Sequence, residues 1–264
     1  MSSPVALENT NDLLRELFCY LGMGKTLDPF TKTRFLKEAS KQSSLDRMHT
    51  LEAYVHTIAG DKESAKKSAL NGLKYIEDSA TISSCLSVLQ LNGYPRVAIE
   101  QVKQLQNYID DPNYLCSFGT FFTVYPDVLL MERAMSKLEK MELHTSGDLG
   151  SLYRYFNGVS STVESAVEEL NVEKSICSRI IEHASSVVEN AGVVLNSTEI
   201  IRQPESDWLS VVVNIETQTT RQLAELNWEL AGELFDAELY SPSVVARFEM
   251  VEPEDVIARI RYAD

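Results

Sequence analysis

Apolar side chains recur at helical spacing near the start of the chain. In residues 11–20 they are spaced to share one face of a helix: Leu13, Leu14, Leu17 and Phe18. This spacing predicts an amphipathic helix that Asn11 or Asp12 would cap. Residues 30–39 have a similar pattern and predict its antiparallel mate. The pair, within residues 1–42, is expected to cap whatever helical structure follows.

The helical pattern then repeats with a period of 33 residues, between residue 46 and about residue 141. Gly60 aligns with Gly93, and Ala65 aligns with Ala98. In each copy the glycine ends one helix, where a residue free to adopt positive φ is favoured. The alanine that follows lies where the two helices of a hairpin come closest. The period therefore predicts stacked helical hairpins.

These positions resemble the turn, small-residue and proline positions of tetratricopeptide repeats. The residues that carry the resemblance are Gly60-Asp61 with Ala65, Gly93-Tyr94 with Ala98, and the closing Asp111-Pro112-Asn113. A looser third copy would end one helix at 121–125 and form the next at 127–141. The resemblance implies an N-terminal domain over residues 1–145, built as a solenoid of α-hairpins.

In that family the first helix of each repeat lines a groove that holds a protein partner. The resemblance implies groove-facing positions at Arg47, Thr50, Tyr54, Thr57, Ser83, Ser87 and Gln90. They are mostly small, polar and neutral, which suits hydrogen bonding to a peptide. They lack the cluster of Lys and Arg with which some members bind a terminal carboxylate, so that ligand is not predicted.

The pattern changes after the polar segment 145–150. The elements expected beyond it are helices over 152–170 and 172–190, a β-hairpin from 198–202 and 208–215, a helix over 217–235, a strand over 243–248 and a helical turn from Pro253. This order predicts a small α+β domain over residues 151–264 with a three-stranded sheet. The whole chain is therefore expected to be α+β and mostly α. The sheet edges would favour homodimerisation.

Charge separates the two parts of the chain further. The net charge is −15, and residues 141–264 hold 22 Asp and Glu against 8 Lys and Arg. Phosphate neutralisation needs the opposite sign, so direct nucleic-acid binding is not expected. The acidic surface either keeps the protein soluble or attracts a basic protein partner.

Other counts bear on where the protein acts. Its 4 cysteines are widely scattered, as is typical of reduced thiols in a cytoplasmic protein. No apolar run reaches the roughly 18 residues that a membrane helix needs, so no membrane insertion is predicted. Residues 1–11 are polar and do not have the pattern of a secretory signal.

Two motifs invite a chemical interpretation. Residues 22–26 read Gly-Met-Gly-Lys-Thr, but Cys19 stands where a phosphate-binding loop needs its first glycine, so a loop between helices is favoured. His49, Glu52 and His56 could share a helix face, either as zinc ligands or as polar packing residues, and packing is favoured. The sequence therefore predicts no catalytic residue, no cofactor and no metal.

The helix over 217–235 carries an acidic stripe, Glu225, Glu229 and Glu233, beside a leucine seam. The stripe is interpreted as a solvated face, or alternatively as a docking surface for Lys and Arg of a partner. Trp228 lies between stripe and seam. Packing on the sheet is favoured for it over a place in an interface.

The leading hypothesis is a non-enzymatic adaptor or chaperone-like scaffold. Its repeat half would bind a partner protein, and its acidic half would dimerise or make a second contact. The alternative is an inhibitor, antitoxin-like or nucleic-acid-mimicking, that neutralises a basic partner. A third hypothesis is an enzyme whose site forms at the junction of the two domains.

Overall fold

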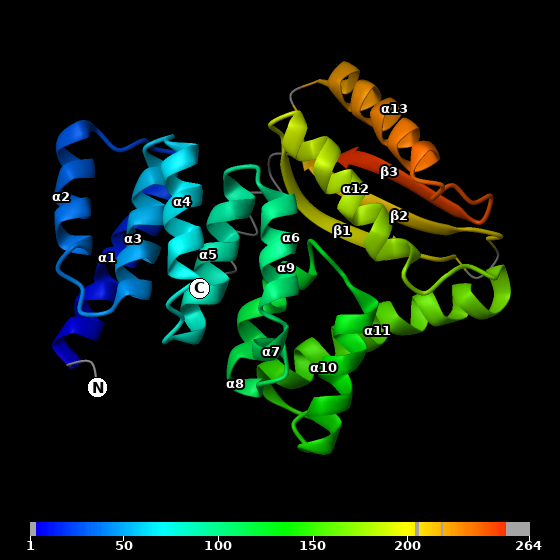
Figure 1. Cartoon of the computed structure of the whole chain (residues 1–264), viewed down its shortest axis with the longest axis horizontal. Coiled ribbons are helices and arrows are strands. Elements are labelled where there is room, and N and C mark those ends of the chain that lie inside the picture. Colours follow the sequence, from blue (N-terminus) through cyan, green and yellow to red (C-terminus); the bar gives the residue numbers. More distant parts are fainter. Residues whose placement is uncertain (1–3, 204–205, 218, 252–264) are drawn as a thin grey trace. The chain divides into compact units, whose positions relative to one another are not determined.

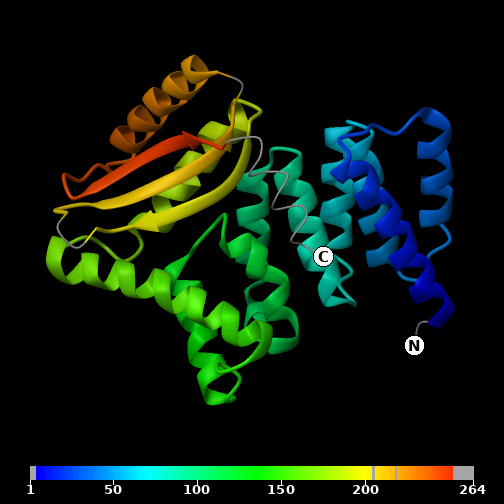
Figure 2. The same ribbon diagram turned by 180° about the vertical axis from the view of Figure 1, so that it is seen from behind.

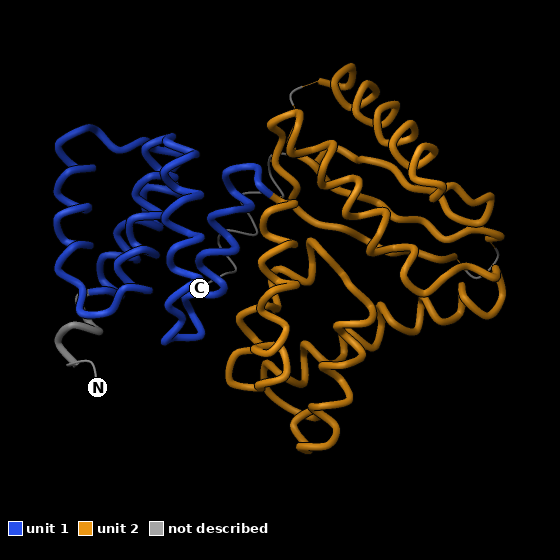
Figure 3. The backbone as a smooth tube through the Cα atoms, in the orientation of Figure 1, with its two compact units in different colours: residues 1–94, 252–264 blue, residues 95–251 orange. Residues whose placement is uncertain are grey.

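The computed structural model describes residues 4–203, 206–217 and 219–251, and it has a mostly helical α+β fold (Figure 1). The described residues form two compact units, which divide between Tyr94 and Pro95 (Figure 3). This division lies well ahead of the domain boundary expected at 145–151. The helical turn expected from Pro253 lies outside the described residues. None of the described helices is long and apolar enough to cross a membrane.

The first unit is made of helices. They are α1 (Pro4–Gly22), α2 (Pro29–Ala39), α3 (Leu45–Ile58), α4 (Lys62–Gly72) and α5 (Ser79–Leu91). Both α1 and α2 pack against α3, and α5 contacts α3 and α4. The expected start of α1 was wrong, because the helix begins at Pro4 and neither Asn11 nor Asp12 caps it. Proline is tolerated in a first helical turn, where its missing N–H is not needed.

Short polar side chains start the other helices of this unit. Asp28, Ser44, Asp61 and Asp78 each accept a hydrogen bond from a backbone N–H in the first turn that follows. Gly60 has a φ of 74° and reverses the chain between α3 and α4, as the sequence predicted. Residues 22–26 form the end of α1 and the loop to α2, which confirms the prediction of a loop there.

The α3–α4 hairpin is held closely together by small residues. Ala53 and Ala65 are fully buried. A Cβ atom on Gly72 would lie 2.8 Å from Sγ of Cys85, so the end of α4 approaches α5 as closely as a glycine allows. Burial raises the pKa of the Cys85 thiol to about 12, which keeps it protonated.

The second unit begins with helical segments of unequal length. They are α6 (Pro95–Gln104), α7 (Gln106–Ile109), α8 (Pro112–Leu115), the 3-10 turn η1 (Cys116–Phe118), α9 (Gly119–Phe122), α10 (Val128–Lys140), α11 (Gly147–Leu170) and α12 (Ile176–Asn190). α7, α8, η1 and α9 are all short. α7 stands at the end of the expected second repeat, and α8, η1 and α9 stand where the looser third repeat was expected to have one helix. α10 matches the helix expected at 127–141.

A three-stranded mixed sheet completes this unit, as the sequence predicted. It consists of β1 (Val194–Ile201), β2 (Leu209–Glu216) and β3 (Val244–Met250), with α13 (Thr220–Asp236) between the last two strands in the chain. β2 is central, antiparallel to β1 and parallel to β3. α12 packs on β1 and β2, and α13 packs on β3 and on α12. Figure 2 shows the sheet from the side away from these helices.

The outer edge of β3 is partly covered by one side chain of α13. The amide of Asn227 accepts a hydrogen bond from the N–H of Phe248 at 2.8 Å and donates one to its carbonyl oxygen at 3.1 Å. An amide side chain thus takes the place that a neighbouring strand would occupy. The cover makes this edge a poor template for pairing with another chain.

Candidate functional site

A small cleft of about 100 Å³ opens in the first unit between α1, α3 and α5. The residues that line it are Thr10, Asn11 and Leu14 of α1, Arg47 and Thr50 of α3, Asp78, which caps α5, and Ala80, Thr81 and Ser84 of α5. Most of these side chains are polar and small. The cleft thus lies where three helices meet, at the N-terminal end of α5.

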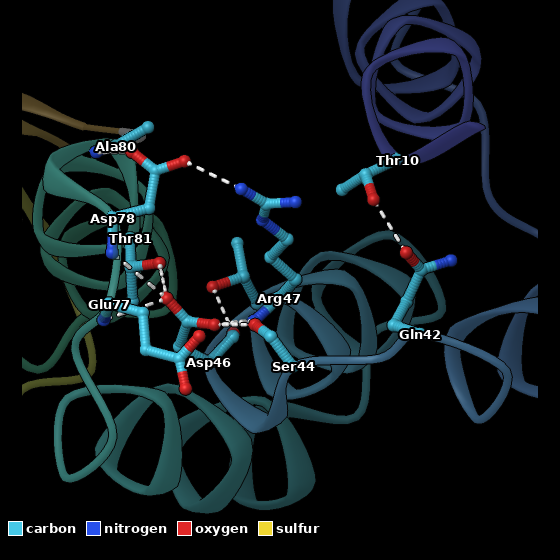
Figure 4. Close-up of polar contacts among 10 residues, drawn as sticks. Thr10, Gln42, Ser44, Asp46, Arg47, Glu77, Asp78, Ala80 and Thr81 are labelled. Atoms are coloured by element: carbon cyan, nitrogen blue, oxygen red, sulfur yellow. Dashed lines mark hydrogen bonds and ion pairs between the residues drawn. The ribbon is translucent and has the colours of Figure 1, made fainter. Parts of the chain in front are cut away.

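Arg47 is the charged donor of this cleft. Its side chain is only 15% exposed, and its Nη2 lies 3.3 Å from Oδ2 of Asp78. Nη1 is buried and has no hydrogen-bond partner among the described residues. In Figure 4 the guanidinium extends into the space between Asp78 and Thr10. Since buried polar atoms are normally paired, the cleft lacks an acceptor for Nη1.

The neighbouring residue, Asp46, holds Arg47 and Asp78 in this arrangement. It is fully buried, and its Oδ2 accepts hydrogen bonds from the N–H groups of Glu77 and Asp78 and from the Thr81 hydroxyl, at 3.1, 3.2 and 3.0 Å. Ser44 donates to its other oxygen (Figure 4). Burial alone would raise the pKa of Asp46, but these hydrogen bonds hold it below its usual value of 3.8.

Asp46 therefore joins the start of α3 to the loop before α5, and so places Arg47 beside Asp78. Sequence reasoning missed Asp46. An acidic residue in a first helical turn is an ordinary feature that favours the helix, and the sequence does not distinguish a buried acid from a solvated one there.

Some of the residues expected to face a groove are covered instead. Tyr54 is buried and meets the ring of Phe18 on α1 edge-on at 5.0 Å. Thr50 is buried and donates to the carbonyl of Asp46, although it also borders the cleft. Thr57 accepts a hydrogen bond from Asn92. The expectation of an open surface at Thr50 and Tyr54 was wrong, because α1 lies against this side of α3.

On α5 the expected positions and the observed cleft fall on different residues. Ser83, Ser87 and Gln90 are partly exposed but do not line the cleft, whereas Ser84 does. The structure thus brings Arg47 and Thr50 together in one site and leaves the other five predicted groove residues outside it. Partner binding stays a prediction for the four of them that are partly exposed, Thr57, Ser83, Ser87 and Gln90.

The acidic stripe on α13 is exposed along its length. Glu225 pairs with Arg221 at 2.9 Å, and Glu233 lies 3.4 Å from His183. The favoured interpretation of Trp228 was wrong, because its side chain is 83% exposed rather than packed on the sheet. The buried face consists of Leu226, Leu230 and Leu234, and this face turns Trp228 away from the strands.

The two histidines of α3 make separate contacts. Nδ1 of His49 lies 2.8 Å from Glu52, while His56 lies 3.4 Å from Asp61. In the part of the chain that the structure describes, no group of three His, Cys, Asp or Glu residues could hold a metal ion.

A polar cluster around the buried Tyr125 joins three helices of the second unit. The hydroxyl of Tyr125 lies 2.7 Å from Glu182 of α12 and 3.1 Å from Asp127, which caps α10. Lys103 of α6 reaches the same oxygen of Glu182 at 2.7 Å. Burial and the two carboxylates raise the pKa of Tyr125, so it stays protonated and acts as a structural donor.

A shallow depression on α11 holds a second arginine. Arg202 pairs with Glu169 at 2.6 Å and also contacts Ser165. Its charge is thus compensated within the chain, by a carboxylate that borders the same depression. Nε of Arg202, like Nη1 of Arg47, is buried without a hydrogen-bond partner among the described residues. The ion pair of Arg47 with Asp78 is the longer of the two, 3.3 Å against 2.6 Å.

Comparison with known proteins yields no match to a protein family, to a curated protein or to a solved structure. The function of the cleft is therefore argued from its own geometry.

Proposed function

We propose that the protein is an adaptor or scaffold, and that its first unit holds a segment of a partner protein in the cleft between α1, α3 and α5. The observation that carries the proposal is the buried, unpartnered Nη1 of Arg47. A carbonyl oxygen of a bound peptide would supply the missing acceptor once the guanidinium turns toward the cleft, because Nη1 has almost no accessible surface in the free chain. Leaving such a donor unsatisfied costs free energy, so an acceptor that reaches it contributes to affinity.

The size of the cleft favours a peptide over a cofactor. Pockets for small molecules usually enclose roughly 300–1,000 Å³, whereas this cleft encloses about 100 Å³. That volume suits one side chain of a longer segment, whose remainder would lie across the exposed surface of α1 and α5. We further propose that the first unit is a tetratricopeptide-like repeat. The packing of α3 on α4 and the turn between them at Gly60 support this.

The chemistry of the cleft indicates how the segment would be recognised. Residues 1–94 carry 11 Lys and Arg against 11 Asp and Glu, so this part of the chain has no net charge to attract a charged partner from a distance. Recognition would depend on hydrogen bonds from Arg47, Asn11 and Ser84. The acidic second unit would make a further contact or mediate dimerisation. We place the protein in the cytoplasm, since its cysteines are free thiols.

The test compares two neighbouring substitutions on α1. Peptides are selected from a random display library on the immobilised full chain, and their affinities are measured by fluorescence anisotropy. Asn11→Trp fills the mouth of the cleft from an exposed position and should weaken binding at least about tenfold. Asp12→Trp changes an exposed neighbour that does not line the cleft and should leave binding unchanged. Equal affinity for both variants would refute the proposed site.

A further inference from the structure

Three large aromatic side chains lie exposed on and just after α13. Trp228 is 83% exposed, Phe235 is 65% exposed and Tyr240 is 68% exposed. Trp228 and Phe235 are seven residues apart, so they share one face of the helix about 10 Å apart along its axis. The rings of Phe235 and Tyr240 stack with centroids 5.5 Å apart. Aromatic side chains gathered in this way are typical of a surface that binds another molecule.

Small residues lie between the two aromatic positions of the helix. Ala231 and Gly232 are exposed, and a Cβ added to Gly232 would meet no atom within 4 Å. Glycine inside a helix destabilises it relative to alanine. Nothing in the fold of this unit requires glycine here. A partner backbone that approaches closely between the two rings would require it.

Carboxylates border the aromatic face. Glu225 and Glu229 adjoin Trp228 in the helix, and Glu233 and Asp236 continue the acidic side; residues 95–251 as a whole carry 24 Asp and Glu against 11 Lys and Arg. This charge repels an anionic lipid surface, and it also repels a second copy of the same face. It attracts Lys and Arg, which additionally bind over aromatic rings.

We infer that the outward face of α13 is a docking surface for a basic amphipathic helix of a partner protein. The apolar side of that helix would pack on Trp228 and Phe235. The backbones of the two helices would come closest at Gly232. Its Lys and Arg side chains would reach Glu225 and Glu229. This surface lies in the second unit and goes beyond the proposed function, because binding here does not require the cleft around Arg47.

The test uses the indole of Trp228 as its own reporter. The full chain carries Trp208→Phe, so that Trp228 is its remaining tryptophan. The probe is a synthetic helix of about 18 residues, made of Leu and Lys at helical spacing and free of aromatic residues. Saturable binding should shift the Trp228 emission to shorter wavelength and should weaken as salt is added. An unchanged emission spectrum at saturation would overturn the inference.

Matched variants in the otherwise native chain then separate docking from nonspecific attraction. Trp228→Ala should weaken binding of the labelled probe about tenfold or more, while Phe30→Ala, which removes an equally exposed ring from α2, should not. The double variant Glu225→Gln/Glu229→Gln should weaken binding of the probe more than the control double variant Glu164→Gln/Glu168→Gln, which lies on α11. Both pairs are exposed i, i+4 glutamates, and each has one ion-paired member.

Gly232→Ala gives the sharpest contrast. It should raise the thermal unfolding midpoint of the free chain, because alanine favours the helix. It should nevertheless weaken binding of the probe, because the added methyl group keeps the partner helix away. Equal weakening by both glutamate pairs would overturn the inference. So would a Trp228-dependent dimer in sedimentation, or binding to phosphatidylserine vesicles in place of the peptide. Asn11→Trp should leave the probe unaffected, which keeps this test independent of the cleft.

Discussion

Asp46 and Arg47 are neighbours in the sequence with opposite roles. Asp46 is a fully buried anion whose hydrogen bonds are made within the chain. Arg47 points to the cleft and keeps one donor unpaired. The difference follows from the helix, which rotates successive side chains by about 100°. A buried charge of this kind is tolerated only where several donors meet it.

Replacing Asp46 tests its structural role. In Asp46→Asn one acceptor oxygen becomes an NH₂ group that faces N–H and O–H donors. We expect the free energy of unfolding to fall by about 2 kcal/mol in urea titrations, since a charged hydrogen-bonding group is lost from a buried site. Asp12→Asn, at an exposed position of α1, is the matched control and should stay within about 0.5 kcal/mol of wild type. Equal stability of both variants would mean that the Asp46 hydrogen bonds contribute little.

His56 should make stability depend on pH. Burial and the nearby charge of Lys32 lower its pKa from 6.5, although Asp61 opposes the shift. The unfolded chain therefore binds a proton more readily than the folded one, so the free energy of unfolding should fall as the pH drops below 6.5. His56→Gln should flatten this part of the curve of stability against pH. A variant with the same slope as wild type would assign the dependence to other groups.

At the level of secondary structure, the sequence predicted the elements that have a clear period or a clear cap. α2, α10, the β1–β2 hairpin, α13 and β3 lie within a few residues of their expected bounds. The short segments α7 to α9 were not predicted, because their breaks interrupt the period. The burial of Tyr54 was missed for a different reason: it depends on where α1 packs, a tertiary contact that periodicity does not encode.

The cover of the β3 edge was also invisible in the sequence, and it can be tested. Asn227→Leu removes both hydrogen bonds to the backbone of Phe248 and leaves its N–H without that acceptor. We expect a loss of about 1–3 kcal/mol of stability, together with particle growth in dynamic light scattering at high concentration, because the edge becomes free to pair. Glu229→Leu adds an exposed leucine to the same helix and controls for surface hydrophobicity. Equal aggregation of the two variants would contradict the role of Asn227.

For the whole molecule, the uneven charge follows from the sequence, but the division into units does not. The 33-residue repeat extends on both sides of residue 94, so its second copy was expected to lie entirely within the N-terminal domain. In the structure α6 belongs to the second unit, where it packs on α12 and where Glu189 accepts the N–H of Arg96 at 3.0 Å. Contacts between segments distant in the chain decide the division. Of the residues that line the cleft, the sequence predicted only Arg47 and Thr50 as binding positions.

Hydrogen–deuterium exchange of the full chain with a library-selected peptide tests the central claim most directly. The account predicts slower exchange in three segments that converge on the cleft, residues 8–15, 46–51 and 78–85, while residues 220–236 exchange as in the free chain. Exchange that stays unchanged in all three segments at saturating peptide, with protection elsewhere, would contradict a binding site around Arg47.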